Sequence, residues 1–262
     1  MAGGSAAVQG ALWGTRVRDW AEVQEGTARP LFERVLDRTN VGSGTRFLDV
    51  GCGAGLACHL GATRGAEVAG LDATEPLLAV ARQRVPTADL RVGEMEQLPF
   101  EDAAFDVVTG FNSFQYAARP LQALAEAKRV ARPGAFVVVA VWGAPEDCQA
   151  AAYLAALRPL LPSPPPGAPG PFALSDPNVL RTLATDAGLK PGDPEDVSCP
   201  WIYPNLETAL RGLLSAGPAV LAIQTSGQER VREATIRALE PFRTASGMYR
   251  LENKFRYLAG TA

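Results

Sequence analysis

The sequence predicts an α/β fold in which a largely parallel sheet is covered by helices on both faces. From residue 45 onwards, short apolar runs alternate with segments of helical periodicity, the pattern of strand–helix–strand units. The runs are apolar throughout, as in strands that are buried on both faces. With 262 residues, 47% of them apolar, the chain has the material for one large doubly wound domain with an added cap.

Seven segments have the composition and spacing of strands. They are Thr45–Val50, Glu67–Leu71, Leu90–Val92, Phe105–Phe111, Ala135–Trp142, Glu195–Tyr203 and Gly247–Leu258. Helical segments fall between them at Leu56–Thr63, Glu75–Arg84, Leu121–Ala131 and Asp176–Ala187. Arg132-Pro133-Gly134 follows the third of these helices and Gly188 follows the fourth, which predicts that the helices end there.

Three further segments do not belong to this alternation. Residues 12–39 show a helical apolar stripe that is interrupted around Pro30, and the small and polar residues before them (MAGGSAAVQG) predict a frayed tail. Residues 143–175 and 205–241 interrupt the strand–helix rhythm, and we expect them to form a partial lid over the strand ends. The first contains PSPPPGAPGP at 162–171, which predicts a surface loop, and the second predicts two or three short helices.

The composition narrows the class of partner. A net charge of −3, from 25 basic and 28 acidic residues without a basic patch, argues against nucleic acid. The longest apolar run, at 135–143, is far shorter than the ~20 residues that cross a bilayer, and no secretion signal is present. Four cysteines without CxxC spacing and a single histidine argue against a metal site. We therefore expect a cytoplasmic protein with a small-molecule substrate and no membrane partner, either a monomer or a homodimer.

A glycine-rich turn, GCGAG at residues 51–55, follows the first apolar run RFLDV. The dinucleotide fingerprint G-x-G-x-x-G/A would place its third small residue at Leu56, whereas here the third glycine comes one position earlier. Asp49, just before the turn, would repel a pyrophosphate but would pair with an ammonium group. A ligand that combines a ribose with a free amino acid, S-adenosylmethionine (SAM), fits this pattern better. A purely structural glycine turn remains open.

Acidic residues also end the next two apolar runs. Asp72 comes 21 residues after Gly51, where its carboxylate would accept both ribose hydroxyls or, alternatively, cap the following helix. Glu94 follows the third strand, where it would accept an adenine amino hydrogen while Met95 contacts the base. Because parallel strands meet at one edge, Asp49, Asp72 and Glu94 are expected to lie together at the topological switch point.

These motifs resemble those of class I SAM-dependent methyltransferases, in the small-molecule group (methyltransferase type 11) that includes the ubiquinone and menaquinone biosynthesis enzymes. The matching stretches are FLDVGCGAG, VAGLDAT, GEMEQLPFEDAAFDVV, GFNSFQY and ARPGAFVVVAVWG, within residues 45–142. The resemblance implies a Rossmann-like sheet of seven strands, mostly parallel, with an antiparallel last strand inserted beside the fifth. It also implies that residues 1–40 form a helical segment over the cofactor site and that residues 41–262 form the SAM-binding domain. The family usually has Asp where Glu94 stands.

The resemblance also assigns roles within the cofactor site. It assigns the methionine ammonium to Asp49 and to the backbone of Gly51 and Phe111, and the close turn to Gly53 and Gly55. The remaining assignments are ribose contacts for Asp72 and Ala73, adenine contacts for Glu94 and Met95, and the surroundings of the reactive methyl group for Asn112 and Ser113. Trp20 would pack over the sulfonium and Arg18 would pair with the methionine carboxylate, or the helix would simply dock on the core.

The acceptor side is less defined by the sequence. The residues expected to line it are Trp20, Ser113, Gln115, Tyr116 and Trp142, and they suggest a hydrophobic or aromatic acceptor. Many relatives carry a histidine after the fourth strand, but this chain reads Asn112-Ser113-Phe114-Gln115-Tyr116 there. His59, inside the helix that follows the glycine turn, is better explained by packing. No catalytic residue is therefore assigned, and proximity alone, Tyr116 or an acid from the cap remain the alternatives.

The sequence thus predicts an enzyme that transfers a methyl group from SAM to a small molecule by in-line displacement. Two other functions stay open. One is a SAM-binding protein that does not transfer methyl groups and acts as a regulator or as a non-methylating catalyst. The other is a nicotinamide-dependent oxidoreductase, against which the displaced third glycine and Asp49 both argue.

Overall fold

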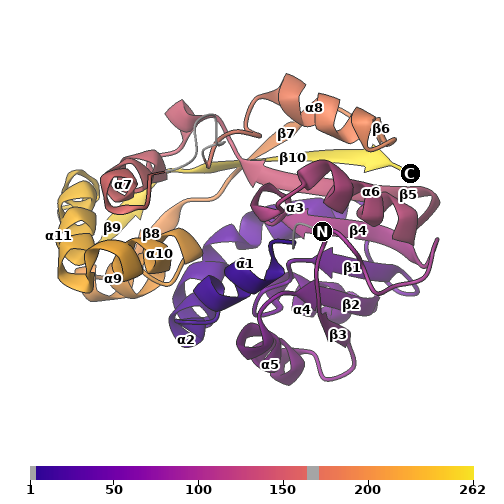
Figure 1. Cartoon of the computed structure of the whole chain (residues 1–262), viewed down its shortest axis with the longest axis horizontal. Coiled ribbons are helices and arrows are strands. Elements are labelled where there is room, and N and C mark those ends of the chain that lie inside the picture. Colours follow the sequence, from indigo (N-terminus) through magenta and orange to yellow (C-terminus); the bar gives the residue numbers. More distant parts are fainter. Residues whose placement is uncertain (1–3, 164–170) are drawn as a thin grey trace.

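The computed structural model describes residues 4–163 and 171–262 and has a central sheet between helices, with a helical cap at one end (Figure 1). The sheet order is β3-β2-β1-β4-β5-β10-β6, and β7 also pairs with β10. The strands are β1 (Arg46–Val50), β2 (Glu67–Asp72), β3 (Asp89–Val92), β4 (Phe105–Phe111), β5 (Ala131–Trp142), β6 (Lys190–Pro191), β7 (Glu195–Ser198) and β10 (Lys254–Thr261). This is the predicted Rossmann-like arrangement.

The direction of the strands creates a switch point between β1 and β4. Strands β1 to β5 run parallel, and β10 runs antiparallel between β5 and the two short strands β6 and β7. From β1 the chain builds outward to β2 and β3, then returns to β4 on the other side of β1. Loops that leave β1 and β4 therefore diverge and open a crevice at their carboxyl ends, where open α/β sheets bind ligands.

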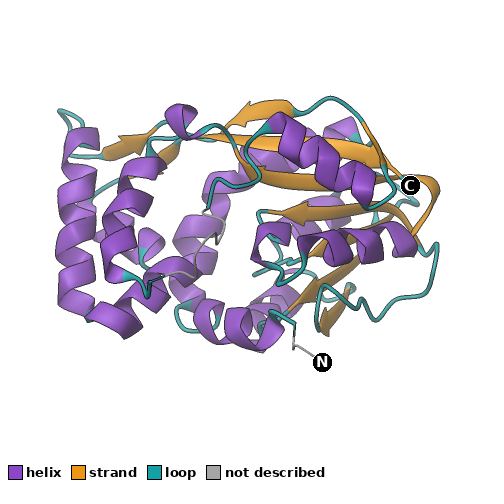
Figure 2. Ribbon diagram, turned by 45° about the horizontal axis from the view of Figure 1, so that its top comes forward, coloured by secondary structure: helices purple, strands orange, loops and turns teal. Residues whose placement is uncertain are grey.

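Helices cover both faces of the sheet (Figure 2). They are α3 (Arg29–Arg38), α4 (Leu56–Thr63), α5 (Glu75–Arg84), α6 (Pro120–Val130) and α8 (Pro177–Asp186). The apolar strands fill both layers: the neighbours Phe47 and Leu48 of β1 enter opposite clusters of the core, and each is 0% exposed. This two-sided burial is the reason that the strands are apolar throughout.

Two of the predicted strands are each divided in the structure. The predicted strand 195–203 becomes β7 and β8 (Trp201–Tyr203), and the predicted strand 247–258 becomes β9 (Tyr249–Leu251) and β10. β8 and β9 pair with each other in a separate two-stranded sheet, while the central sheet counts eight strands because β6 and β7 take the place of one. Pro200 has no amide hydrogen to donate to a neighbouring strand. Buried Asn253 accepts a hydrogen bond from Ala150 N (2.9 Å). Both predicted strands are therefore interrupted at the base of the cap.

The helices of the cap are α7 (Ala150–Leu157), α9 (Leu206–Leu213), α10 (Gly217–Ser226) and α11 (Gln228–Leu239). The proline-rich loop expected at 162–171 lies largely outside the described residues. Within the described ranges no single helix has the length and apolar character to cross a membrane. Helices α9 and α10 reach that length and composition only as a pair, bent by 92°.

The N-terminal region differs from the frayed tail that its composition predicted. Residues 6–13 form α1 (Ala6–Trp13), followed by α2 (Val17–Asp19), a π-helical turn η1 (Trp20–Gln24) and a 3-10 turn η2 (Glu25–Ala28). Gly10 lets α1 approach the core closely, since a Cβ atom there would lie 2.5 Å from the carbonyl oxygen of Ala73. Contacts with Ala73 and Glu94 hold this helix against the edge of the sheet.

Candidate functional site

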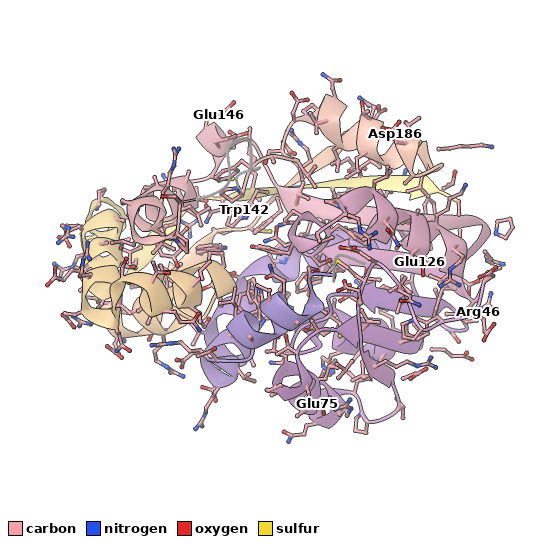
Figure 3. The ribbon with its side chains drawn as sticks, in the orientation of Figure 1. Arg46, Glu75, Glu126, Trp142, Glu146 and Asp186 are labelled. Atoms are coloured by element: carbon pink, nitrogen blue, oxygen red, sulfur yellow. The ribbon has the colours of Figure 1, made fainter. Side chains whose placement is uncertain are left out.

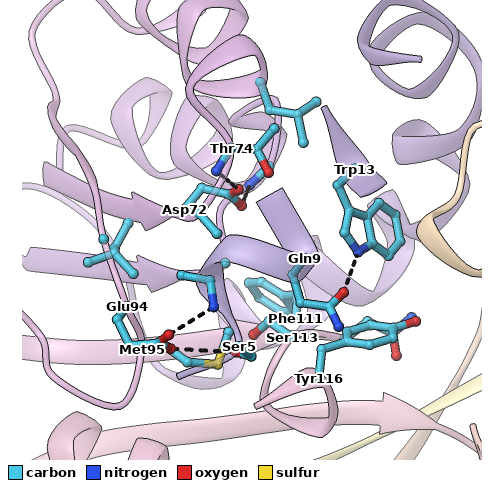
Figure 4. Close-up of a pocket in the computed structure, with 18 of the residues that line it drawn as sticks. Ser5, Gln9, Trp13, Asp72, Thr74, Glu94, Met95, Phe111, Ser113 and Tyr116 are labelled. Carbon is cyan, nitrogen blue, oxygen red and sulfur yellow. Dashed lines mark hydrogen bonds between the residues drawn. The ribbon is translucent and has the colours of Figure 1, made fainter. Parts of the chain in front are cut away.

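A pocket lies at the carboxyl ends of β1 to β4, and α1 covers it (Figure 4). Its empty space is about 700 Å³, including the part open to solvent. It is lined by Ser5, Ala6, Gln9, Trp13, Trp20, Gly51, Gly53, Leu71, Asp72, Ala73, Thr74, Leu77, Gly93, Glu94, Met95, Phe111, Asn112, Ser113 and Tyr116. Most of the residues that the sequence assigned to a cofactor therefore meet around one space.

The glycine turn forms the floor of this pocket. Gly51, Gly53 and Gly55 all have positive φ, of +79°, +54° and +81°. A side chain at Gly51 would also overlap Ser113, which follows β4 and whose Oγ donates to Val50 O at 2.6 Å. The turn thus brings bare backbone against the end of β4, and Gly55 begins α4 without lining the pocket itself.

Asp72 lies at the carboxyl end of β2, on the wall of the pocket, and holds the glycine turn in place. Its carboxylate accepts hydrogen bonds from Gly53 N (2.8 Å) and from Thr74 N (2.9 Å), so it ties the turn to the start of α5. It also lines the pocket, at 9% exposure. Burial raises its pKa above the ordinary value, and the amide hydrogens oppose that rise. Each carboxylate oxygen accepts one of these bonds and keeps a lone pair for hydroxyl donors.

Asp49 does not line the pocket, although it directly precedes the turn. It is 2% exposed and accepts a hydrogen bond from Thr109 Oγ1 at 2.8 Å. Burial raises its pKa to about 7, and the nearby charges of Asp72 and Glu25 add to this effect. An ammonium group near the turn would reverse that shift, because a positive charge favours the carboxylate form.

Glu94 points at the N-terminus of α1. Its Oε2 accepts from Ala6 N at 2.8 Å, and Ser5 Oγ donates to its Oε1 at 3.5 Å (Figure 4). The first turn of a helix has free amide hydrogens and a positive dipole end, so the carboxylate is stabilised there. Glu94 and Met95 both line the predicted adenine end, and Glu94 also fastens the covering helix.

The end of β4 forms the opposite wall. Phe111, Asn112 and Ser113 line the pocket, and Asn112 has a φ of +54°, unusual for a residue with a side chain. The Asn112 amide donates to Ala140 O at 2.8 Å, which holds it at this angle. Gln115 does not line the pocket: its side-chain amide donates to Asn112 Oδ1 from behind, so it supports Asn112.

Aromatic residues enclose the side of the pocket toward the cap. The Trp13 ring makes edge contacts with Trp20 (4.7 Å between ring centres) and Tyr116 (5.6 Å). Burial raises the pKa of Tyr116 to about 12. The phenol is therefore protonated at neutral pH, where it is suited to donate a hydrogen bond and not to accept a proton.

Two expected site residues lie elsewhere. Trp142 is stacked on Phe255 (4.7 Å) and contacts Trp201 (5.5 Å), in the core where the sheet meets the cap (Figure 3). It is the last residue of β5, where β10 pairs with it through Phe255. Arg18 is on the outside, paired with Glu22 at 2.7 Å with its side chain 86% exposed. The structure thus places neither residue at the pocket.

Sequence reasoning missed the residues of α1. Ser5, Ala6 and Gln9 line the pocket, and Gln9 Oε1 accepts from Trp13 Nε1 at 3.1 Å. Alanine, glutamine and leucine, which make up most of this segment, are good helix formers, so its composition is compatible with a helix. The spacing of Gln9 and Trp13, one helical turn apart, was the available sign of a helix.

The ionisable side chains that line the pocket are acidic, which favours a positively charged ligand. Asp72 and Glu94 line it and Asp49 lies behind the turn, whereas no Lys or Arg is among the residues described as lining it. Such a site suits a cation that carries hydroxyl groups and opposes a pyrophosphate. Within residues 4–163 and 171–262, no group of three or more His, Cys, Asp or Glu residues could hold a metal ion.

The sheet order, the glycine turn and the acidic residues at the ends of β1, β2 and β3 define a class I SAM-dependent methyltransferase domain. Residues 48–139 match the family model described as "Methyltransferase domain". This part of the chain is thus a SAM-dependent methyltransferase domain, and it is similar to ubiquinone and menaquinone biosynthesis enzymes.

Among the relatives, a demethylmenaquinone methyltransferase of Renibacterium salmoninarum is 36% identical over 120 residues, 46% of this chain and 51% of that protein. A malonyl-[acyl-carrier protein] O-methyltransferase of Serratia marcescens is 36% identical over 110 residues, 42% of this chain and 43% of that protein. The chain spans about half the length of these curated relatives. The YcgJ protein of Bacillus subtilis has the same fold, with a TM-score of 0.60 and 20% identity over 88% of this chain and 97% of that one.

Proposed function

We propose that the whole chain is an enzyme that transfers the methyl group of SAM to a small-molecule acceptor. The observation that carries this proposal is the pocket itself, in which the glycine turn, Asp72 and Glu94 surround one space without a lining Lys or Arg among the described residues. The match of residues 48–139 to the methyltransferase family supports it.

Each side of the pocket has a part in holding the cofactor. Asp72 accepts the ribose hydroxyls with the lone pairs that Gly53 N and Thr74 N leave free. Asp49, ionised by the ligand's ammonium, holds the amino acid end through the turn. Met95 packs against the adenine, and Glu94 accepts from the adenine amino group as well as from α1.

Bound SAM supplies a methyl group that is activated by its positive sulfur. With SAM bound, an acceptor atom would take the methyl carbon as the carbon–sulfur bond breaks, and the electron pair of that bond would stay on sulfur. The protein then contributes alignment and exclusion of water, since α1, Trp13 and Trp20 close the pocket. The Tyr116 hydroxyl donates a hydrogen bond that orients the acceptor.

The acceptor is hydrophobic or aromatic in this proposal, because Trp13, Trp20 and Tyr116 form the wall on its side. The two relatives named above act, by their names, on a quinone precursor and on an acyl-carrier-bound acid, so likeness alone does not identify the acceptor here. An acceptor proton leaves to solvent, since burial keeps Tyr116 from acting as the base.

A protein that binds SAM without transferring its methyl group is the second candidate. What favours it is that the pocket's described ionisable residues, Asp72, Glu94 and Tyr116, are either occupied by backbone amides or held neutral. An oxidoreductase is disfavoured because a pyrophosphate would meet the carboxylates of this pocket.

Two measurements separate these functions. Calorimetry should detect SAM binding with a Kd in the micromolar range or tighter, and NAD should produce no heat. Labelled SAM incubated with a panel of phenols, quinols, carboxylic acids and amines should then yield a labelled product. Absence of SAM binding contradicts the whole proposal, whereas binding without any labelled product supports the second candidate.

A further inference from the structure

A short strap, defined as residues 17–28 (α2, η1 and η2), carries a buried acid that the cofactor assignments do not use. Glu25 is 5% exposed, and its Oε1 accepts a hydrogen bond from Leu56 N at 3.2 Å, at the start of α4. Its Oε2 pairs with Arg84 of α5. A buried carboxylate is expensive unless it is paired, so its presence at this turn needs a reason.

Glu25 lies against the open side of the glycine turn. A Cβ atom built on Gly53 would be 3.7 Å from Glu25 Oε1 and 3.5 Å from Trp20 Nε1. Gly53 and Trp20 both line the pocket. Glu25 Oε1 is therefore separated from the pocket only by Gly53 and Trp20. This is the side of the pocket where the proposed function places the amino acid part of the cofactor.

Arg84 stands behind Glu25 and not in the pocket. Its guanidinium contacts the other carboxylate oxygen, Oε2, and also donates to Ala54 O (2.9 Å) and Ala21 O (2.8 Å). Glu25 Oε1 thus faces Gly53 and Leu56 N, while Arg84 contacts the turn at Ala54 O. Burial raises the pKa of Glu25 and the Arg84 charge lowers it, so a cation in the pocket would favour the ionised form further.

From this geometry we infer that Glu25 is a selectivity residue that makes the pocket prefer the positively charged cofactor over its neutral product. SAM carries a sulfonium, an ammonium and a carboxylate, for a net charge of +1, whereas S-adenosylhomocysteine has no sulfonium and is neutral overall. Glu25 adds a third carboxylate near the glycine turn, beside Asp49 and Asp72. The inference rests on the proposed function. A weaker affinity for the neutral product would help S-adenosylhomocysteine to leave after methyl transfer.

The test compares three ligands on the full-length chain. Glu25→Gln keeps the shape of the side chain and an oxygen for Leu56 N, but removes the charge. We expect the Kd for SAM to rise on the order of 10-fold, and the Kd for S-adenosylhomocysteine to change by less than about 2-fold. Sinefungin, which has an ammonium group in place of the sulfonium, should follow SAM.

Glu22→Gln is the matched control, because Glu22 is on the same strap but is exposed and paired with Arg18 (2.7 Å) and Arg211 (2.9 Å). It should leave both constants within about 2-fold of the wild type. An equal loss of affinity for SAM and for S-adenosylhomocysteine in Glu25→Gln would show a structural role only, and would overturn the inference. Failure of the wild-type protein to bind either ligand would instead overturn the proposed function.

A second variant covers the case in which Glu25→Gln does not fold. Glu25→Asp keeps the charge but withdraws it by one methylene, and the pair with Arg84 remains within reach. The Kd for S-adenosylhomocysteine divided by the Kd for SAM should then fall by about 2-fold to 3-fold, less than in Glu25→Gln, which loses the charge. An unchanged ratio in a folded Glu25→Asp variant contradicts the inference.

Discussion

Asp49 shows, at the level of one residue, how a binding function conflicts with stability. Its carboxylate is buried beside one hydroxyl donor, Thr109, and burial brings its pKa to about 7. An unpaired buried carboxylate destabilises the folded chain once it ionises. Such a residue is understandable where a cationic ligand supplies the missing partner, which is the role proposed here.

The raised pKa of Asp49 predicts a pH-dependent stability difference between the wild type and Asp49→Asn. The folded state holds the Asp49 proton more tightly than the unfolded state, whose pKa is near 4. The contribution of Asp49 is thus complete below pH ~4 and is lost as the pH rises through about 7. At pH 8, Asp49→Asn should be more stable than the wild type by roughly 2–4 kcal/mol in urea denaturation, and at pH 4 by much less.

The same variant should bind SAM at least 10-fold more weakly, because the amide does not pair with an ammonium group. In the wild type, SAM affinity should increase between pH 6 and 8 as Asp49 ionises. Calorimetry at the two pH values checks both statements. A stable Asp49→Asn protein with unchanged SAM affinity would remove Asp49 from the cofactor site.

Asp72→Asn should weaken SAM binding by about 2–3 kcal/mol, or roughly 30-fold to 150-fold in Kd, since an amide loses one acceptor for the ribose hydroxyls. The variant keeps an oxygen for Gly53 N or Thr74 N, so the turn should still form. Asp89→Asn is the control: Asp89 starts β3, is exposed and pairs only with Arg91 on the surface. Equal affinities in the two variants would argue against the ribose contact.

At the scale of elements, α1 works as a cover whose position depends on a glycine and on a capping acid. Gly10 brings α1 against the backbone of Ala73, and Glu94 caps its first turn through Ala6 N. Its other end reaches the cap, where a side chain at Gly217 would press on Trp13, at 2.6 Å from the indole nitrogen. The helix therefore depends on both the sheet edge and α10 for its place over the pocket.

Gly10→Ala tests this cover. Alanine favours a helix by ~1 kcal/mol over glycine, so α1 itself should form more readily. Its Cβ atom would nonetheless meet the Ala73 carbonyl oxygen at 2.5 Å, which should push the helix off the pocket. We expect SAM to dissociate several-fold faster in stopped-flow measurements. Gly26→Ala is the matched control, because no atom lies within 4 Å of a Cβ there, and it should leave the rate unchanged.

At the scale of the whole molecule, the strap (residues 17–28) joins the cap to the cofactor turn. Tyr203 of the small β8–β9 sheet donates to Gln24 Oε1 at 2.8 Å, and Arg211 of α9 pairs with Asp19 (2.7 Å) and Glu22 (2.9 Å). One residue further, Glu25 reaches the glycine turn. The π-helical turn at Trp20–Gln24 directs Gln24 to the cap and Trp20 to the pocket, a use of π-turns that is common at functional sites.

Tyr203→Phe should weaken this junction and lower the free energy of unfolding by about 1–2 kcal/mol, because the buried Gln24 oxygen loses its donor. Urea denaturation measures the change. Tyr249→Phe is a suitable control, since Tyr249 lies opposite Tyr203 in the β8–β9 pair and its hydroxyl makes no hydrogen bond to the described residues. Losses of equal size in both variants would show that the Tyr203 hydroxyl bond contributes nothing of its own.

The amino-acid sequence by itself determined the parallel sheet, the glycine turn and the acidic residues at the strand ends. These features depend on residues that are close in the sequence. Apolar runs predict buried strands, and because parallel strands end at the same edge of the sheet, the acids that follow them lie at that edge. Asp72, Glu94, Met95 and Phe111 were therefore predictable as neighbours around one pocket, and the structure brings them there.

Only the tertiary structure decided the covering helix and the positions of Glu25 and Trp142. Helix α1 lies over the pocket because Gly10 meets Ala73 and Glu94 meets Ala6, contacts between residues more than 60 positions apart. Likewise, the pairing of β10 with β5 assigns Trp142 to the core, and Arg84 holds Glu25 at the turn. Such long-range contacts depend on how the helices and the cap pack on the sheet, and the periodicity of the sequence does not predict them.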